Sequence, residues 1–159
     1  MNIKNMYEFI PDYSYIENNN YYLIQFDGGS RGNPGKSAGG AIIYYINNLN
    51  NKILIYKCGK YKKLATNNQA EYIGLLCGIN KAIELNIKNI LIEGDSLLVI
   101  NQILNKWKVN NKILTKYYNK IIKLFYLFNS IGIKHIKRHL NIEADLIVNN
   151  IINNEKNIK

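Results

Sequence analysis

The order of the apolar segments predicts an α/β protein built on a five-stranded mixed sheet with flanking helices. Three β-branched and aromatic runs come first, at 21–26, 38–46 and 52–58, and two further runs follow at 88–93 and 131–136. Between the third and fourth runs, between the fourth and fifth, and after the fifth, the apolar residues recur at helical intervals. We therefore expect the element order βββαβααβα, in which helices cover the faces of the sheet.

Length and charge narrow the class of protein. The chain has 159 residues, which suits one domain; we expect it to span 21–153, between an N-terminal extension, 1–20, and a frayed polar tail, 154–159. The formal net charge is +10, from 21 Lys and Arg against 11 Asp and Glu, and this excess favours a polyanionic partner such as nucleic acid. Genome base composition alone explains part of it, because the sequence is rich in Ile, Asn, Lys and Tyr throughout.

Several classes of protein are disfavoured. No apolar run reaches the roughly 18 residues of a membrane span, so we expect no membrane association. The first twenty residues carry Glu8, Asp12 and Glu17 and lack the apolar segment of a signal peptide, so we expect a cytoplasmic protein, with a nuclear or organellar location left open if the source is eukaryotic. We also expect a monomer. Cys58 and Cys77 show no spacing typical of zinc sites or disulfide frameworks. Whether the aromatic residues of the extension pack on the domain or bind a partner stays open.

The first half of the domain contains three strands and a helix. The run 21–26 ends in Asp27 and a glycine cluster, GGSRGNPG, which predicts a strand that enters a loop. The next two runs are separated by the polar turn NNLNN and predict a hairpin. Thr66 and Gln69 have the spacing of a capping box, so we expect a helix of about 17 residues from near Asn68.

The second half alternates strands and helices. The fourth strand ends at Gly94, and Ser96 can cap the helix after it. The stretch 112–128 reads as the next helix, with an expected apolar face of Ile113, Tyr117, Ile121, Leu124 and Phe128. After the fifth strand, Asn141 can cap a final helix.

Four acidic residues lie at positions where folding does not require an acid. Asp27 and Asp95 end strands, whereas Glu71 and Asp145 lie in the first turns of helices. Strand ends and helix starts on the same side of a sheet are close in space, so we expect these carboxylates to converge. Each has an ordinary alternative explanation, as a helix-dipole partner or a turn former. Four such residues at convergent ends favour a shared site.

Converging carboxylates need a positive group, because like charges at short range raise each other's pKa. Arg31, Lys36 or Arg138 could supply it. Oxygen-only ligands favour a hard cation such as Mg²⁺ or Mn²⁺, and a pair of such ions suits phosphodiester hydrolysis. The glycine cluster lacks the P-loop pattern and precedes a strand, so we expect it to bring bare backbone amides close to a ligand.

Four motifs resemble the catalytic motifs of type 1 ribonuclease H. They are FDGGSRGNPG at 26–35, TNNQAEY at 66–72, IEGDS at 92–96 and RHLNIEAD at 138–145, in the order of that family. The resemblance implies a ribonuclease H-like fold and metal-dependent endonucleolytic cleavage of the RNA strand of RNA/DNA hybrids, leaving 5′-phosphate and 3′-hydroxyl ends. It also implies that the same four acids, Asp27, Glu71, Asp95 and Asp145, bind two Mg²⁺ ions per site, with Mn²⁺ as a possible substitute.

The resemblance further implies contacts to the hybrid. The backbone of Gly28 and Gly29, with the side chains of Asn67 and Asn68, would read the minor groove, where the 2′-hydroxyl distinguishes RNA from DNA. Thr66 matches a family position that holds a phosphate of the DNA strand.

The remaining candidates leave alternatives open. Trp107 lies about where the family places an aromatic residue along the DNA channel, but a lone Trp between two helices can equally pack in the core. Many members carry a mobile His in the loop before the last carboxylate; here the candidates are Arg138, as in the shorter-loop branch, and His139.

Two other classes of function compete with this prediction. A nuclease of the same fold could act on DNA, since fold does not fix substrate; the TNNQAEY motif argues against it. A non-catalytic module could merely bind nucleic acid, and the complete set of four acids argues against that.

Overall fold

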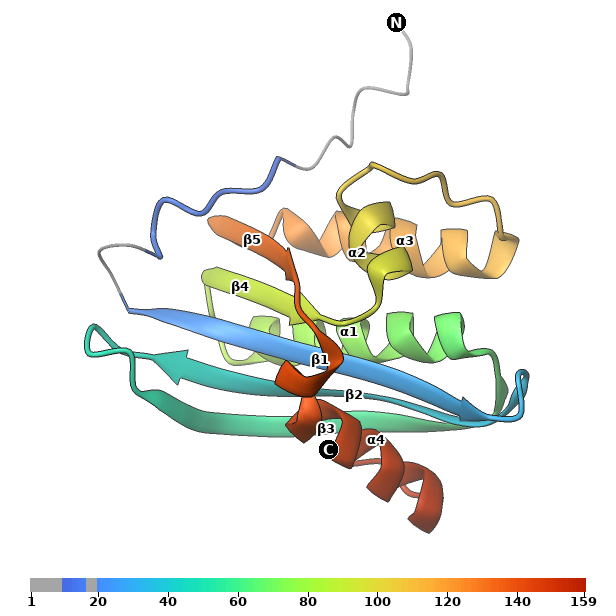
Figure 1. Ribbon diagram of the computed structural model, residues 1–159. Helices are drawn as coiled ribbons and strands as arrows, with labels where there is room; N and C mark the ends of the chain where they lie inside the picture. Colours follow the sequence, from blue (N-terminus) through green and yellow to red (C-terminus); the bar gives the residue numbers. More distant parts are fainter. Residues whose placement is uncertain (1–9, 17–19) are drawn as a thin grey trace, which may run out of the picture.

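The computed structural model describes residues 10–16 and 20–159, and its centre is one mixed sheet (Figure 1). The strands are β1 (Tyr21–Arg31), β2 (Gly35–Ile46), β3 (Lys52–Ala65), β4 (Asn89–Gly94) and β5 (Ser130–His135). Their order across the sheet is β3-β2-β1-β4-β5. The first three strands pair antiparallel, whereas β4 runs parallel to β1 and β5 parallel to β4. The predicted fold class and element order are confirmed.

The helices cover both faces of this sheet. They are α1 (Asn67–Glu84), α2 (Leu97–Ile103), α3 (Lys112–Phe125) and α4 (Ile142–Asn154), with a short 3₁₀ helix, η2 (Arg138–Leu140), before α4. In Figure 1, α4 lies in front of the sheet and α1 behind it. None of the described helices is long and apolar enough to cross a lipid bilayer.

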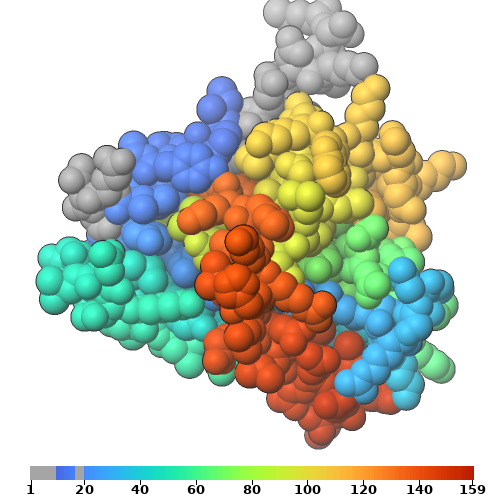
Figure 2. Space-filling model, viewed as in Figure 1, coloured from blue at the N-terminus to red at the C-terminus, as the bar shows by residue number. Residues whose placement is uncertain are grey.

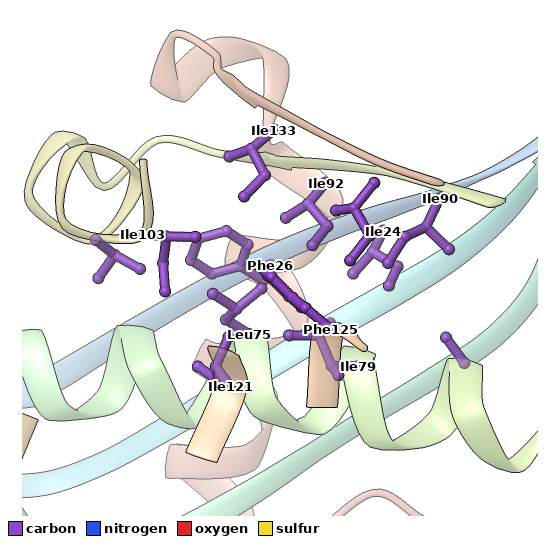
Figure 3. Close-up of a cluster of buried hydrophobic side chains, with 14 of the residues drawn as sticks. Ile24, Phe26, Leu75, Ile79, Ile90, Ile92, Ile103, Ile121, Phe125 and Ile133 are labelled. Atoms are coloured by element: carbon purple, nitrogen blue, oxygen red, sulfur yellow. The ribbon is translucent and has the colours of Figure 1, made fainter. Parts of the chain in front are cut away.

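Alternate strand residues supply two separate cores. Ile24, Phe26 and Ile92 point to the larger core, which α1, α2 and α3 cover. Figure 3 shows the Phe26 ring among side chains from the strands and helices of this core. Leu23, Ile42 and their neighbours form the smaller core under α4. The period-2 alternation of a strand thus divides the apolar residues between two helical layers.

Local capping signals set the helix starts. Thr66 accepts a hydrogen bond from the Gln69 backbone N–H and the Gln69 side chain accepts one from Thr66, so the capping box is present. The helix begins at Asn67, one residue before the predicted position. Ser96 caps α2 by accepting a hydrogen bond from the Val99 N–H at 3.3 Å. These two sequence predictions are confirmed.

The glycine cluster belongs mostly to a strand, which corrects the predicted loop at 28–35. β1 continues to Arg31, and its pairing with β2 runs out to Lys36. Cross-strand hydrogen bonds satisfy the backbone of these residues, so the chain turns only at 32–34. Because β4 pairs with β1 only as far as Phe26, the backbone beyond Asp27 has no strand partner on that side.

The expected apolar face of α3 is partly wrong. The buried residues of this helix are Leu114, Ile121, Ile122 and Phe125, whereas Ile113 is 48% exposed. Asn111 caps the helix through its side chain, which sets the start at Lys112 and turns Leu114 inward in place of Ile113. The helix also ends before Phe128, which is buried from the following turn.

The described part of the N-terminal extension packs on the domain. The Tyr15 hydroxyl accepts a hydrogen bond from the Gly132 N–H at 3.0 Å and donates one to the Ile90 carbonyl. The Tyr13 hydroxyl donates to the Ile133 carbonyl at 2.5 Å, on the outer edge strand β5. The extension thereby covers the open edge of the sheet. Two other aromatic residues of the extension, Tyr7 and Phe9, lie outside the described residues.

The C-terminal tail is ordered, which corrects the frayed end expected at 154–159. Ile158 forms a two-hydrogen-bond bridge with Gly59, at 2.8 and 3.0 Å. The Asn157 side chain also accepts a hydrogen bond from the Tyr61 N–H. β3 is the other edge of the sheet, and the tail satisfies backbone groups that this edge would otherwise expose.

Candidate active site

Three of the four predicted carboxylates meet at one end of the sheet. Asp27 lies in β1 and Asp95 directly follows β4, and these strands are parallel neighbours, with Phe26 beside Gly94. Glu71 is the fifth residue of α1, in its second turn and not in the predicted first turn, because the helix begins at Asn67. One carboxylate oxygen from each of the three lies within 4.8 Å of the others. The convergence expected from strand ends and helix starts is confirmed for these three residues.

A close approach between α1 and β1 brings Glu71 to the site. A Cβ atom placed on Gly28 would lie 2.1 Å from the Glu71 backbone nitrogen and 2.2 Å from the Ala70 carbonyl carbon. Only a residue without a side chain fits there. The start of α1 therefore rests directly on the backbone of β1, next to Asp27.

Asp145 stands at the rim of the cluster. It lies in the first turn of α4 and lines the same groove as the three inner acids. Its Oδ1 atom is 3.6 Å from Nη2 of Arg138, whose side chain is 81% exposed. An ion pair with so exposed an arginine is weak at this distance, so the Arg138 side chain can reorient toward a ligand. Asp145 is held further by Asn149, whose Nδ2 donates to its Oδ2 at 3.2 Å.

Asn141 is a site residue that the sequence analysis assigned only to capping. Its side chain makes no capping hydrogen bond to α4. Instead Nδ2 donates to Oδ1 of Asp95 and to the carbonyl oxygen of Phe26, both at 2.8 Å. Asn141 is 1% exposed, and its Oδ1 atom is buried without a hydrogen-bond partner in the described structure. In the sequence, the position of Asn141 within the motif RHLNIEAD, four residues before Asp145, could have indicated a site residue. The same position also suits the cap of a helix.

Burial and mutual repulsion shift the proton affinity of the inner acids. Burial raises the pKa of Asp27 to about 7, and the neighbouring Asp95 charge adds to the rise. Burial likewise raises the pKa of Glu71 well above its usual value, while the charge of Arg138 acts in the opposite direction. A cation bound between these groups would reverse the effect, since it favours the ionised form of both carboxyls.

The donor set fits a divalent cation with hard-ligand preferences. All three inner ligands offer carboxylate oxygens. Oε2 of Glu71 is buried and has no hydrogen-bond partner in the described structure. A buried carboxylate oxygen left unsatisfied is costly, so it points to a ligand that supplies positive charge.

A groove of about 400 Å³ surrounds the acids and contains several of the predicted contact residues. Gly28, Gly29 and Asn67 line it beside the four carboxylates and Arg138. Asn67 accepts a hydrogen bond from the Ser30 N–H at 2.8 Å, which fixes this side chain at the groove. In Figure 2, the turn between β1 and β2 (light blue) lies beside α4 (red), in keeping with a hydrogen bond from Arg31 to Asn153.

Other predicted contact residues lie outside this groove. Asn68 and His139 are exposed and do not line it. Arg138, rather than His139, is therefore the loop residue that faces the acids. The Thr66 hydroxyl is engaged in the helix cap. Trp107 is 46% exposed beside a separate hollow, so the alternative of core packing is wrong for it.

The three candidate neutralising residues have different partners. Arg138 faces Asp145, as described above. Arg31 lines the groove but bonds to Asn153 at the end of α4. Lys36 pairs with Glu155, away from the acids. Only Arg138 among these three acts on the acidic cluster itself.

Comparison with known proteins places the chain in a family. A sequence model of the reverse transcriptase-like family matches residues 25–151. The bifunctional protein Rv2228c of Mycobacterium tuberculosis is 34% identical over 127 residues, covering 80% of this chain and 34% of that protein. Ribonuclease HI of Halobacterium salinarum is 33% identical over 124 residues, covering 78% of this chain and 60% of that protein. The chain thus spans less than two thirds of the length of these curated relatives.

Solved structures share the fold. RNase H1 of Halobacterium salinarum superposes with a TM-score of 0.78 at 30% identity, covering 84% of this chain and 98% of that one. The N-terminal RNase H domain of Rv2228c gives a TM-score of 0.78 at 32% identity, covering 84% and 94%. LC11-RNase H1, solved in complex with an RNA/DNA hybrid, gives 0.76 at 27% identity, covering 84% and 98%. The chain belongs to the reverse transcriptase-like family and has the fold of the type 1 ribonucleases H.

Proposed function

We propose that this protein is an endoribonuclease that hydrolyses the RNA strand of RNA/DNA hybrids. The observation that carries the proposal is the cluster of Asp27, Glu71 and Asp95 within a groove that bare strand backbone and Asn67 also line. Two relatives support the substrate: one is named ribonuclease HI, and another was solved with a hybrid.

The acidic residues would hold the cofactor. Asp27, Glu71 and Asp95, with Asp145 at the rim, offer ligands for two Mg²⁺ ions, or Mn²⁺ in their place. When bound, such ions lower the pKa of an attacking water and stabilise charge on the leaving oxygen, so that cleavage leaves 5′-phosphate and 3′-hydroxyl ends. Asn141 holds Asp95 in position through its amide.

Selection of the RNA strand would depend on the wall of the groove. Beyond Asp27 the backbone of β1 lacks a partner strand on the β4 side, so Gly28 and Gly29 can approach a nucleic-acid groove without side chains between. Asn67 stands beside them and is held by the Ser30 N–H. Such contacts suit 2′-hydroxyl groups, which only the RNA strand carries. The exposed Arg138 guanidinium is available for a backbone phosphate or the departing product.

The test is cleavage of an end-labelled RNA/DNA hybrid, double-stranded RNA, single-stranded RNA and double-stranded DNA, with Mg²⁺ or with EDTA. We expect Mg²⁺-dependent loss of the RNA strand of the hybrid only. Asp95→Asn should lower the cleavage rate by at least about a hundredfold, because it removes a metal ligand, and should leave hybrid binding intact. Glu143→Gln is the matched control, since this exposed acid lies two residues from Asp145 and does not line the groove.

Other outcomes would lead to the competing functions. Cleavage of duplex DNA would indicate a different nuclease of this fold. Hybrid binding without any cleavage would indicate a non-catalytic binding module. The monomeric state and the cytoplasmic location stay predictions, and size-exclusion chromatography of the full chain would test the first.

A further inference from the structure

A second cavity, of about 610 Å³, lies behind the sheet, between β3, α1, α3 and the C-terminal tail. It shares no lining residue with the catalytic groove. Its volume lies within the range of roughly 300–1,000 Å³ that is typical of small-molecule sites. We call it the lysine pocket, because five lysines line it: Lys60, Lys62, Lys81, Lys120 and Lys159.

Every charged side chain that lines this pocket is a lysine. The lysines come from four different elements, and none of the residues that line the pocket is Asp or Glu. Lys81 pairs with Glu84 at 2.7 Å, whereas the other four make no ion pair within the described part of the chain. Several unpaired ammonium groups around one cavity repel each other, so an anion bound among them is stabilised.

The interior of the pocket is apolar. Ile73 and Leu76 of α1, Tyr117 of α3 and Ile158 of the tail contribute to its lining. The Tyr117 ring stacks on the Tyr72 ring, with centroids 6.2 Å apart and planes 19° apart, so its position is fixed by the core. Apolar and aromatic walls of this kind stabilise a ligand by removing its apolar surface from water.

We propose that the lysine pocket binds a small organic anion, with its acidic group among the lysines and its apolar or aromatic body against Ile73, Leu76 and Tyr117. A mononucleotide and a medium-chain fatty carboxylate both have this chemistry. The C-terminal tail completes one wall, because the bridge between Ile158 and Gly59 holds it there. The inference is independent of the proposed nuclease activity.

A native thiol can report whether the pocket is occupied. Cys77 lines the pocket and is partly exposed, whereas Cys58 also borders it but is buried. A ligand seated in the pocket would shield Cys77 from a small alkylating reagent. The intact chain is labelled with iodoacetamide for different times, and peptide mass spectrometry after digestion then gives the rate of Cys77 alkylation. This rate measures occupancy of the pocket independently of nuclease activity.

The experiment compares adenosine monophosphate, decanoate and inorganic phosphate as probes. We expect saturable protection of Cys77 by one or both organic anions, and the more effective of them identifies the source of the ligand. Inorganic phosphate alone should protect little, because it has no body to cover the thiol. No protection by either organic anion, or equal protection by phosphate, would overturn the proposal.

A pair of matched double variants tests the lysines. Lys60→Gln with Lys62→Gln should raise the probe concentration for half-protection by about tenfold, since two charges near the anion are lost. Lys57→Gln with Lys63→Gln removes the same charge from the same strand. Lys57 lies opposite Ile42 of β2, whose side chain belongs to the core under α4. The charge of Lys63 lowers the pKa of Glu155, at the end of α4. Both control lysines are thus on the α4 side of the sheet and not in the lysine pocket. An equal loss in both double variants would show that the anion is bound by general attraction rather than in this pocket.

Discussion

At the scale of single residues, the carboxylate of Asp95 depends on a neutral neighbour for its position. Asp95 follows the last residue of β4, so it lies outside the regular backbone pairing of the sheet. The buried Asn141 amide bonds both to Asp95 and to the Phe26 carbonyl, so it joins the acid to the adjacent strand β1. A neutral donor can do this without adding a charge that would compete with a bound cation.

The first prediction concerns Asn141→Ala. The change removes two hydrogen bonds and leaves the Phe26 carbonyl unsatisfied, so we expect the free energy of unfolding to fall by about 1–3 kcal/mol. The hybrid cleavage rate should fall about ten- to a hundredfold, as when a group that orients a metal ligand is lost. Thermal unfolding and hybrid cleavage measure the two effects. Asn150→Ala, at an exposed position of the same helix, is the control, and equal activity in both variants would remove Asn141 from the site.

The second prediction concerns pH in the absence of divalent ions. The pKa of Asp27 is raised from 3.8 to about 7, so between these values the folded state holds a proton that the unfolded state has lost. The titration of Asp27 should therefore lower the stability as pH rises from about 4 to about 7, by on the order of 4 kcal/mol. Asp27→Asn should remove this contribution, leave the one from Glu71, whose pKa burial also raises, and be the more stable protein at pH 8, and we expect it not to cleave.

Denaturant unfolding in EDTA at several pH values measures this effect. Addition of Mg²⁺ should restore stability to the unsubstituted protein at pH 8 but much less to Asp27→Asn, since the ion replaces the lost proton. A parallel pH dependence of the two proteins would show that Asp27 does not titrate in this window.

At the scale of secondary structure, the site depends on the distance between α1 and β1. The helix start carries Glu71 and rests on Gly28, while a second glycine contact supports it one turn later, where a Cβ on Gly74 would lie 2.2 Å from the Asp27 carbonyl oxygen. The capping box at Thr66 fixes where α1 begins. Helix register and strand approach together determine that Glu71 faces Asp27.

The third prediction compares two adjacent glycines of β1. Gly28→Ala places a methyl group against backbone atoms of α1, which cannot move aside singly, so we expect a loss of about 3 kcal/mol or more and no cleavage. Gly29→Ala meets only Cγ1 of Val148 at 3.5 Å, an ordinary contact, and should change stability by less than about 1 kcal/mol. Thermal unfolding of the two variants decides, and similar melting temperatures would contradict the close approach.

At the scale of the whole molecule, charge is unevenly distributed. The net charge is +10, yet four of the 11 acidic residues lie in or beside one groove. The remaining surface is therefore more basic than the composition alone indicates. Such a distribution attracts a polyanion in general and leaves a local acidic site for cations.

The fourth prediction concerns ionic strength. The affinity of Asp95→Asn for the hybrid should fall by at least about tenfold between roughly 50 and 200 mM salt, because phosphate contacts release counterions. This variant suits the measurement because we expect it to bind the hybrid with little cleavage. Fluorescence anisotropy with a labelled hybrid measures this affinity. An affinity that does not change over this range would exclude binding through contacts between phosphates and the basic surface of the protein.

Several features could be predicted because they depend on neighbours in the chain. Strand and helix periodicity, the Thr66 and Ser96 caps and the convergence of Asp27, Glu71 and Asp95 all follow from short-range patterns. Alternation and capping act over a few residues, so the sequence alone was enough for the fold class and for three converging acids.

Other features were decided only by contacts between distant segments. Asn141 turned from a helix cap to Asp95, which is 46 residues away. The inward face of α3, the length of β1 through its glycines and the docking of the tail on Gly59 likewise depend on which surfaces meet in the folded chain. A side chain takes the partner that best satisfies its buried polar or apolar surface, and that partner is set by the packing of the whole molecule.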